Sequence, residues 1–199
     1  PALRENGRLY VMGDADQQLY PRDAFDFPDA VHIRNGDNFR SPRRVVDAIN
    51  QLQLTRHQVN GRSAHVGTPP GFHIYPEGDA AHAKTLSACV ADLLSQGISA
   101  DQIALVSFKG RERSALLSQK ELAGLKLKTF TGQYNSDRNP IWSDGALLAE
   151  SVYRFKGQSA PVVVVCEIDF ETLTDKERSK LFVGFSRAQY RLECVLSER

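Results

Sequence analysis

Apolar residues recur along the chain in two alternating patterns, short continuous runs and positions at helical spacing. The longest run, 162–168, is β-branched on successive residues, which is typical of a central parallel strand covered on both faces. Shorter runs predict further strands. These lie at 9–12, 30–33, 72–75, 103–108, 125–130, 146–150 and 192–196.

Helical spacing appears between these runs. Ser41 and Pro42 suit the N-cap and the first helical position, and helically spaced apolar residues follow them. Further helices are expected at 79–96, 111–123 and 175–189, and loops at 55–71 and 131–144. Strands that alternate with helices predict an α/β fold, with a parallel sheet and helices on both faces.

Composition adds few constraints. The 199 residues suit one large domain, or one domain with a small attachment, and 25 basic against 24 acidic residues leave a net charge of +1. Any contact with nucleic acid must therefore come from locally placed charges. Three scattered cysteines indicate buried thiols in a reducing compartment, and we expect the cytoplasm. We also expect no membrane span, no signal peptide and, since Pro1 replaces a starting Met, a segment of a longer chain.

Four polar segments are candidates for chemistry. A turn at 13–20 follows the first predicted strand, and Gln17 there suits orienting a water or sensing a phosphate; a solvated turn is the alternative. Arg40 precedes a helix start, where a guanidinium and free amides bind phosphate together; ordinary capping is equally consistent.

The other two segments lie near the last predicted strands. Residues 153–159 form a basic, glycine-containing turn before the longest apolar run, suited either to a phosphate contact or to solvation. Arg187 lies late in an apolar helix. It is either a residue at the rim of the core or an arginine finger that stabilises charge on a phosphoryl group.

The order of these segments resembles that of UvrD/Rep-like superfamily 1 DNA helicases, in their second RecA-like (P-loop NTPase-like) domain. Residues 13–20 resemble motif III, 38–42 motif IV, 155–165 motif V and 183–188 motif VI, and 103–108 resemble the strand between motifs IV and V. The resemblance covers nearly the whole chain. It implies that residues 1–27 end a first RecA-like domain and that 28–199 form the second.

The resemblance also implies roles for individual residues. Gln17 would couple the γ-phosphate of ATP to the nucleic-acid track, and Arg40 and Arg187 would reach that phosphate when two domains close. Arginines supplied in this way accelerate hydrolysis by roughly 10³–10⁵. The remaining implied nucleotide contacts are Lys156, Gly157 and Ser159, and the implied contacts with single-stranded DNA are Tyr20, Arg22, Tyr153 and Arg154.

Three positions depart from the family pattern. Ser159 stands where a ribose-contacting Glu is usual, Pro21 follows Tyr20 where a stacking Trp is common, and 130–145 is too short for the domain that many relatives insert. The sequence also lacks a phosphate-binding Gly-x-x-x-x-Gly-Lys-Ser/Thr loop. ATP and Mg²⁺ would therefore be held mainly by the N-terminal RecA-like domain of the same parent chain, and this fragment alone should not hydrolyse ATP.

Three functions stay open at this point. The first, which the ordered motifs favour, is the second motor domain of an ATP-dependent DNA helicase or translocase. The second is a RecA-like module that binds nucleic acid or protein without ATPase activity. The third is a stand-alone α/β enzyme, which is weakly supported because the five histidines show no ligand spacing and no neighbouring nucleophile.

Overall fold

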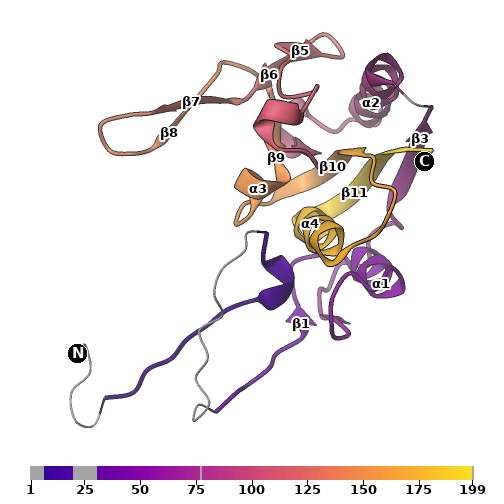
Figure 1. Cartoon of the computed structure of the whole chain (residues 1–199). Helices are drawn as coiled ribbons and strands as arrows, with labels where there is room; N and C mark the ends of the chain where they lie inside the picture. Colours follow the sequence, from indigo (N-terminus) through magenta and orange to yellow (C-terminus); the bar gives the residue numbers. More distant parts are fainter. Residues whose placement is uncertain (1–6, 20–30, 77, 199) are drawn as a thin grey trace.

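The computed structural model describes residues 7–19, 31–76 and 78–198, and a seven-stranded sheet forms its centre. Its strands are β3 (Gly71–Tyr75), β4 (Ile103–Ser107), β5 (Glu121–Leu122), β6 (Leu125–Lys128), β9 (Leu147–Ser151), β10 (Ala160–Ile168) and β11 (Ala188–Ser197). They lie in the order β3-β11-β10-β4-β9-β6-β5. The pairings are parallel except for β5 with β6 (Figure 1). The mainly parallel α/β sheet expected from the sequence is confirmed.

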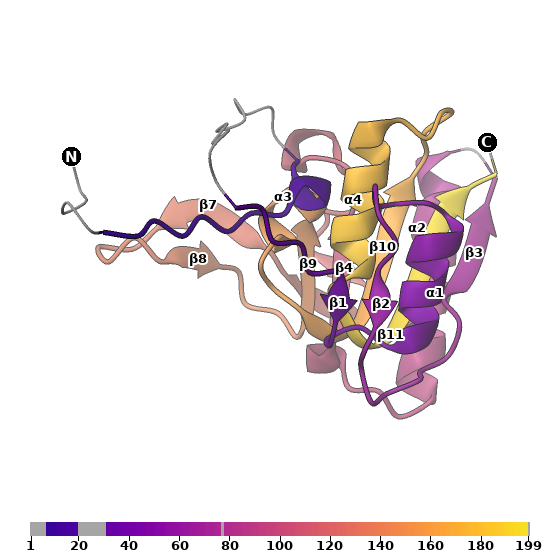
Figure 2. The ribbon, with the colours of Figure 1, turned by 90° about the horizontal axis from the view of Figure 1, so that it is seen from below.

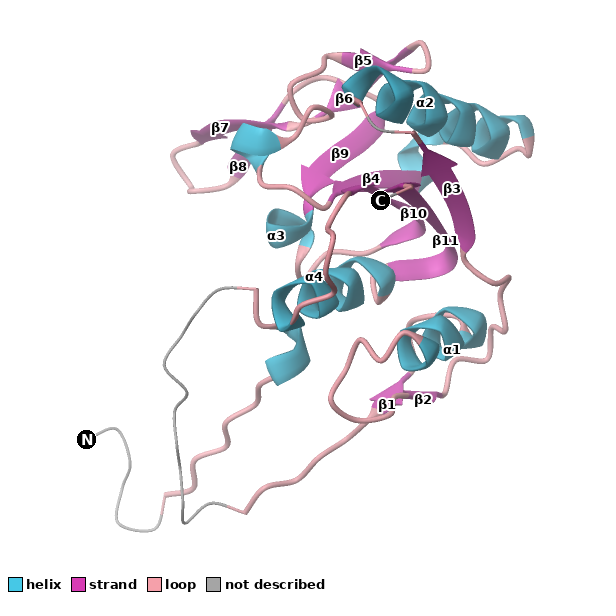
Figure 3. Cartoon of the chain, turned by 45° about the vertical axis from the view of Figure 1, so that its right-hand side comes forward, coloured by secondary structure: helices cyan, strands magenta, loops and turns pink. Residues whose placement is uncertain are grey.

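Helices cover both faces of the sheet (Figure 3). On β10, Val163 and Val165 pack with α1 (Arg43–Gln51), α3 (Val152–Phe155) and α4 (Asp175–Phe185). The alternate residues Val162 and Val164 pack with α2 (Asp79–Ser95) on the other face. Burial on both faces explains why this strand is a continuous apolar run rather than an alternating one. In the described part of the chain, no helix combines the length and apolar character that crossing a bilayer requires.

The start of α1 differs from the expected capping. Pro42 is the N-cap residue, and no side chain caps the helix. Ser41 is buried, and its hydroxyl donates instead to the carbonyl oxygen of Ser186, 3.3 Å away. This hydrogen bond joins the start of α1 to the end of α4, because Ser186 is the C-cap of α4.

Two expected strands do not form. Residues 9–12 and 31–33 are extended but belong to no sheet of the described chain, while residue 30 lies outside the described residues. The side chains of Met12 and Ile33 are 96% and 89% exposed. An apolar run becomes a buried strand only where a sheet edge accepts it. The chain after residue 33 forms a short parallel pair, β1 (Asp37–Asn38) with β2 (Asn60–Gly61), and β2 lies within the expected loop 55–71.

The segment between β4 and β9 also differs from expectation. The helix expected at 111–123 is replaced by a 3₁₀ turn, η3 (Arg111–Arg113), and by β5. The loop expected at 131–144 contains an antiparallel hairpin, β7 (Phe130–Tyr134) with β8 (Pro140–Trp142). The hairpin projects from the body of the molecule (Figure 2). At the base of the hairpin, the guanidinium of Arg154 lies 3.6 Å from the ring centroid of Phe130, a cation–π contact that stabilises this end of the hairpin.

A buried carboxylate shapes the chain after β4. Glu167, 2% exposed, lies in β10 with a positive φ of 60°. Its carboxylate accepts hydrogen bonds from the hydroxyls of Ser107 and Ser114 and from the backbone N–H groups of Ala115 and Leu116. Because these amides bind a side chain, they are not available for a regular helix, which explains the failed helix expectation at 111–123.

Gly145 lies where β9 begins beside β6, and we expect its replacement to be costly. A Cβ at Gly145 would lie 2.4 Å from the backbone carbon of Leu127, which cannot move like a side chain. Gly145→Ala should therefore lower the free energy of unfolding by about 1–3 kcal/mol in urea denaturation. Gly110→Ala is the matched control, because no atom lies within 4 Å of its Cβ position. Equal stability of the two variants would contradict the expected clash.

Candidate functional site

The side chain of Arg187 lies at the end of α4, directly before β11. It is 4% exposed, and its guanidinium donates to the side-chain oxygen of Gln17, a residue 170 positions earlier. Its Nε is buried and has no hydrogen-bond partner among the described residues. A buried donor without an acceptor costs about 1–3 kcal/mol, so the position favours an additional acceptor.

Arg40 is brought towards Arg187 by the turn that precedes α1. The side-chain oxygen of Asn38 accepts the backbone N–H groups of Arg40 and Ser41 at 3.0 and 2.8 Å. Burial and, second, the charge of Arg40 lower the pKa of the Arg187 guanidinium, while Asp14 opposes this shift. Two like charges on neighbouring side chains favour an anion between or beside them.

Gln17 completes this group of side chains. It ends the 3₁₀ turn η1 (Ala15–Gln17), and its amide nitrogen donates to Asp14 at 2.6 Å, while its oxygen accepts from Arg187. Below, the name "arginine cluster" refers to Gln17, Arg40 and Arg187. The three motif-derived residues expected to act together therefore come together in the structure.

An open cleft of about 710 Å³ adjoins the arginine cluster. Gln17 and Arg40 line it, together with Ser186 beside Arg187. Arg56 and His57, from the loop at 55–71, line it on another side. The sequence reasoning missed these two residues, although an adjacent Arg and His in an aperiodic segment was an available signal.

The turn that contains Lys156, Gly157 and Ser159 is joined to Arg187 by a backbone hydrogen bond at the end of the turn. The N–H of Ala160 donates to the carbonyl oxygen of Arg187 at 3.2 Å. Gly157 has a φ of 92°, which favours glycine, and Lys156 is exposed. Ser159 accepts a hydrogen bond from Gln189 at 3.1 Å. The turn and the arginine both lie at the amino ends of β10 and β11.

The four residues expected to contact DNA have different positions. Tyr20 and Arg22 lie outside the described residues. Tyr153 is half-buried, and its ring lies 5.8 Å from the ammonium of Lys180. Arg154 contacts Glu150 at 3.0 Å and Tyr134 of the hairpin at 3.1 Å, rather than the arginine cluster. Burial by itself would lower the pKa of Arg154, but hydrogen bonds and charge interactions with these two partners together raise it.

A family model matches the segment that contains Arg187 and the turn with Lys156, Gly157 and Ser159. Residues 146–193 match the UvrD-like helicase C-terminal domain. The UvrD-like segment runs from β9 into β11 and holds both the basic turn and the arginine at the end of α4. Over these residues the match confirms the resemblance to UvrD-like helicases that was inferred from the sequence.

The whole fold also has a similar solved structure. It is the C-terminal domain of a possible DNA helicase from Lactobacillus plantarum, at a TM-score of 0.53 and 17% identity. The match covers 80% of this chain and 87% of that chain, so the likeness extends well beyond the UvrD-like segment and concerns the fold. No curated protein matches the chain in sequence.

Proposed function

We propose that this chain is the second, RecA-like motor domain of an ATP-dependent DNA helicase or translocase. The observation that carries the proposal is the hydrogen bond between Arg187 and Gln17, with Arg40 beside them. In the motif assignment these residues come from motifs VI, III and IV, and their proximity is expected for such a domain. The match at residues 146–193 supports the same assignment.

The arginine cluster suits the γ-phosphate of a nucleotide. The Nε of buried Arg187 has no acceptor among the residues that the structure describes, and Arg40 is exposed beside it. ATP with Mg²⁺, held mainly by an N-terminal RecA-like domain, would supply the phosphoryl group that is transferred. Arg187 and Arg40 would stabilise charge that develops on that group, and Gln17 would move with the phosphate. Lys156, Gly157 and Ser159 would lie at the edge of the same cleft.

Single-stranded DNA is the proposed track. Contacts with it would be mainly to phosphates, with aromatic stacking in addition. Tyr20, Arg22, Tyr153 and Arg154 are the proposed contacts, and Arg154 would act together with the aromatic residues of the hairpin that it holds. Residues 1–27 would complete the first domain, which fits the exposed apolar side chains at 9–12.

The test compares ATP turnover by the 199-residue chain and by the same chain joined to a first motor domain of the parent helicase. We expect no turnover by the chain alone, since its sequence contains no phosphate-binding loop, and DNA-stimulated turnover by the joined protein. Turnover by the chain alone would contradict the division of roles. A joined protein that binds DNA but hydrolyses no ATP would favour a binding module instead.

A further inference from the structure

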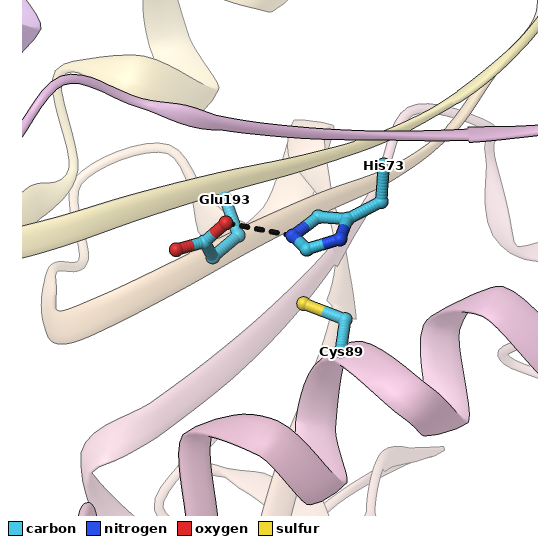
Figure 4. Close-up of side chains that lie close together, drawn as sticks. All are labelled: His73, Cys89 and Glu193. Atoms are coloured by element: carbon cyan, nitrogen blue, oxygen red, sulfur yellow. Dashed lines mark hydrogen bonds and ion pairs between the residues drawn. The ribbon is translucent and has the colours of Figure 1, made fainter. Parts of the chain in front are cut away.

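Three side chains with metal-ligating atoms converge on the face of the sheet that α2 covers (Figure 4). His73 comes from β3, Glu193 from the adjacent β11 and Cys89 from α2. Their ligand atoms lie within 4.8 Å of one another. None of these residues takes part in the arginine cluster, so the proposed motor function does not account for their convergence.

The carboxylate of Glu193 is held in a fixed orientation. It is 3% exposed, and its Oε1 accepts from Nε of Arg191 at 2.5 Å. Arg191 is itself held by Gln96 at 2.6 Å. The other oxygen, Oε2, faces Nε2 of His73 at 2.8 Å. A ligating carboxylate in a metal site is commonly oriented by such an outer hydrogen bond, which leaves its second oxygen for the ion.

The space for this carboxylate depends on a glycine. Gly71 pairs with Glu193 across β3 and β11, and a Cβ at Gly71 would lie 1.8 Å from Oε2 of Glu193. Any other residue at this position would push the carboxylate away from His73. The arrangement of His73, Cys89 and Glu193 therefore also depends on Gly71, which carries no ligating atom.

We propose that Nε2 of His73, Sγ of Cys89 and Oε2 of Glu193 form a binding site for a zinc-type divalent cation, with water as the fourth ligand. Mixed nitrogen, sulfur and oxygen ligands suit Zn²⁺. Bond lengths of about 2.0–2.3 Å in a tetrahedral site place ligand atoms roughly 3.3–3.8 Å apart. The His73–Glu193 pair must therefore open by about half an ångström, as the cation replaces the shared proton. The side chain of His73 is 33% exposed and gives water access.

The charges in this arrangement suit a divalent cation. Burial, with Glu193 as the second cause, raises the pKa of the Cys89 thiol to about 12, so it is not a free nucleophile near neutral pH. Binding would break the S–H bond, form a metal–sulfur bond and release the proton to solvent. The thiolate and the carboxylate then balance the two charges of the cation, and Arg191 keeps its existing contact with Glu193.

Titration with Co²⁺, followed by displacement with Zn²⁺, tests the site on the 199-residue chain. We expect one Co²⁺ per chain, with a thiolate-to-metal absorption band that Zn²⁺ removes. Cys89→Ala should lose that band, whereas the control Cys166→Ala should keep it, because Cys166 is also buried but lies outside the three-residue group. Circular dichroism of both variants checks that each one is folded.

His73→Gln gives a second, independent test, because His73 lies at the exposed edge and its replacement leaves no cavity in the core. We expect Zn²⁺ affinity, measured by calorimetry, to fall roughly tenfold or more. The proposal is overturned if the folded wild-type chain shows no thiolate band, if Cys89→Ala retains it, or if His73→Gln binds Zn²⁺ as tightly as wild type. These measurements need no ATP and no first domain, so they are separate from the test of the motor function.

Discussion

In the proposed motor, replacing Arg187 with alanine is expected to lower the ATP turnover of the protein that joins this chain to a first motor domain by roughly 10³-fold or more. The reason is geometric: Arg187 is buried, its guanidinium donates to Gln17, and its Nε has no hydrogen-bond partner among the described residues, so the side chain is held in place before the proposed phosphate binds. Binding of single-stranded DNA should largely survive, because the proposed track residues lie elsewhere. Steady-state ATPase rates and fluorescence anisotropy with a labelled oligonucleotide measure the two effects.

Two further variants sharpen this prediction. Arg187→Lys keeps the charge but loses the fork of donors, so it should recover only a small part of the turnover. Arg44→Ala is the matched control, since Arg44 is exposed, lies in α1 and pairs through its guanidinium with the exposed Asp47. If Arg187→Ala turned over ATP near the wild-type rate, the arginine would have no catalytic role in this protein.

The largest expected effect on stability concerns Glu167. Glu167→Ala should lower the free energy of unfolding by roughly 3–5 kcal/mol, because four buried or half-buried donors would lose their common acceptor. Urea denaturation followed by circular dichroism measures this difference. The midpoint should fall, while the dependence on urea concentration stays the same if unfolding remains two-state.

Glu167→Gln distinguishes the hydrogen bonds from the charge. The amide oxygen can still accept from Ala115 and Leu116, and the amide nitrogen can donate to the two serine hydroxyls, so the loss should be only about 1–2 kcal/mol. Glu171→Ala, at a nearby exposed position, should be close to neutral. A glutamine variant as unstable as the alanine variant would mean that the carboxylate charge, rather than the hydrogen bonds, stabilises the segment after β4.

Much of the sheet could be predicted from local pattern. The run at β10 and the helical spacing at α1, α2 and α4 each satisfy one simple geometric rule, and the structure confirms all four elements. However, α4 ends at Phe185 rather than at the expected residue 189, because β11 begins at Ala188. The expected strands at 9–12 and 30–33 show where the rule fails, although residue 30 lies outside the described residues. Apolar character identifies residues that need burial, but whether a strand forms depends on a neighbouring edge, which the local sequence does not contain.

The segment from 111 to 144 contains the strand expected at 125–130 as β6, but it lacks the helix expected at 111–123 and forms a hairpin where a loop was expected. Its structure is determined by partners far along the chain: Glu167 binds the amides of 115 and 116, and Arg154 lies against Phe130 at the base of the hairpin. Propensity within the segment cannot reveal either contact. An acidic residue at the end of a long apolar strand was the only local sign that Glu167 is special.

In the candidate site, too, some residues could be predicted from the sequence and others depended on contacts between distant parts of the chain. The motif order identified Gln17, Arg40 and Arg187, and the structure brings them together although 170 positions separate the first from the last. The group of His73, Cys89 and Glu193 was not found, because no ligand spacing exists among residues that come from a strand, a helix and another strand. Only the parallel register of β3 with β11 brings the histidine and the glutamate together.

The place of β11 in the sheet has a consequence for synthesis. Residues 188–197 follow every other strand in sequence, yet β11 lies between β3 and β10 and is the neighbour on which β3 depends within the sheet. During synthesis, more than a hundred residues therefore have to be translated after β3 before its partner β11 leaves the ribosome. Parallel pairing over such a distance is intrinsically slow and leaves an edge open to wrong partners, so this chain should depend on chaperones until β11 has been synthesised.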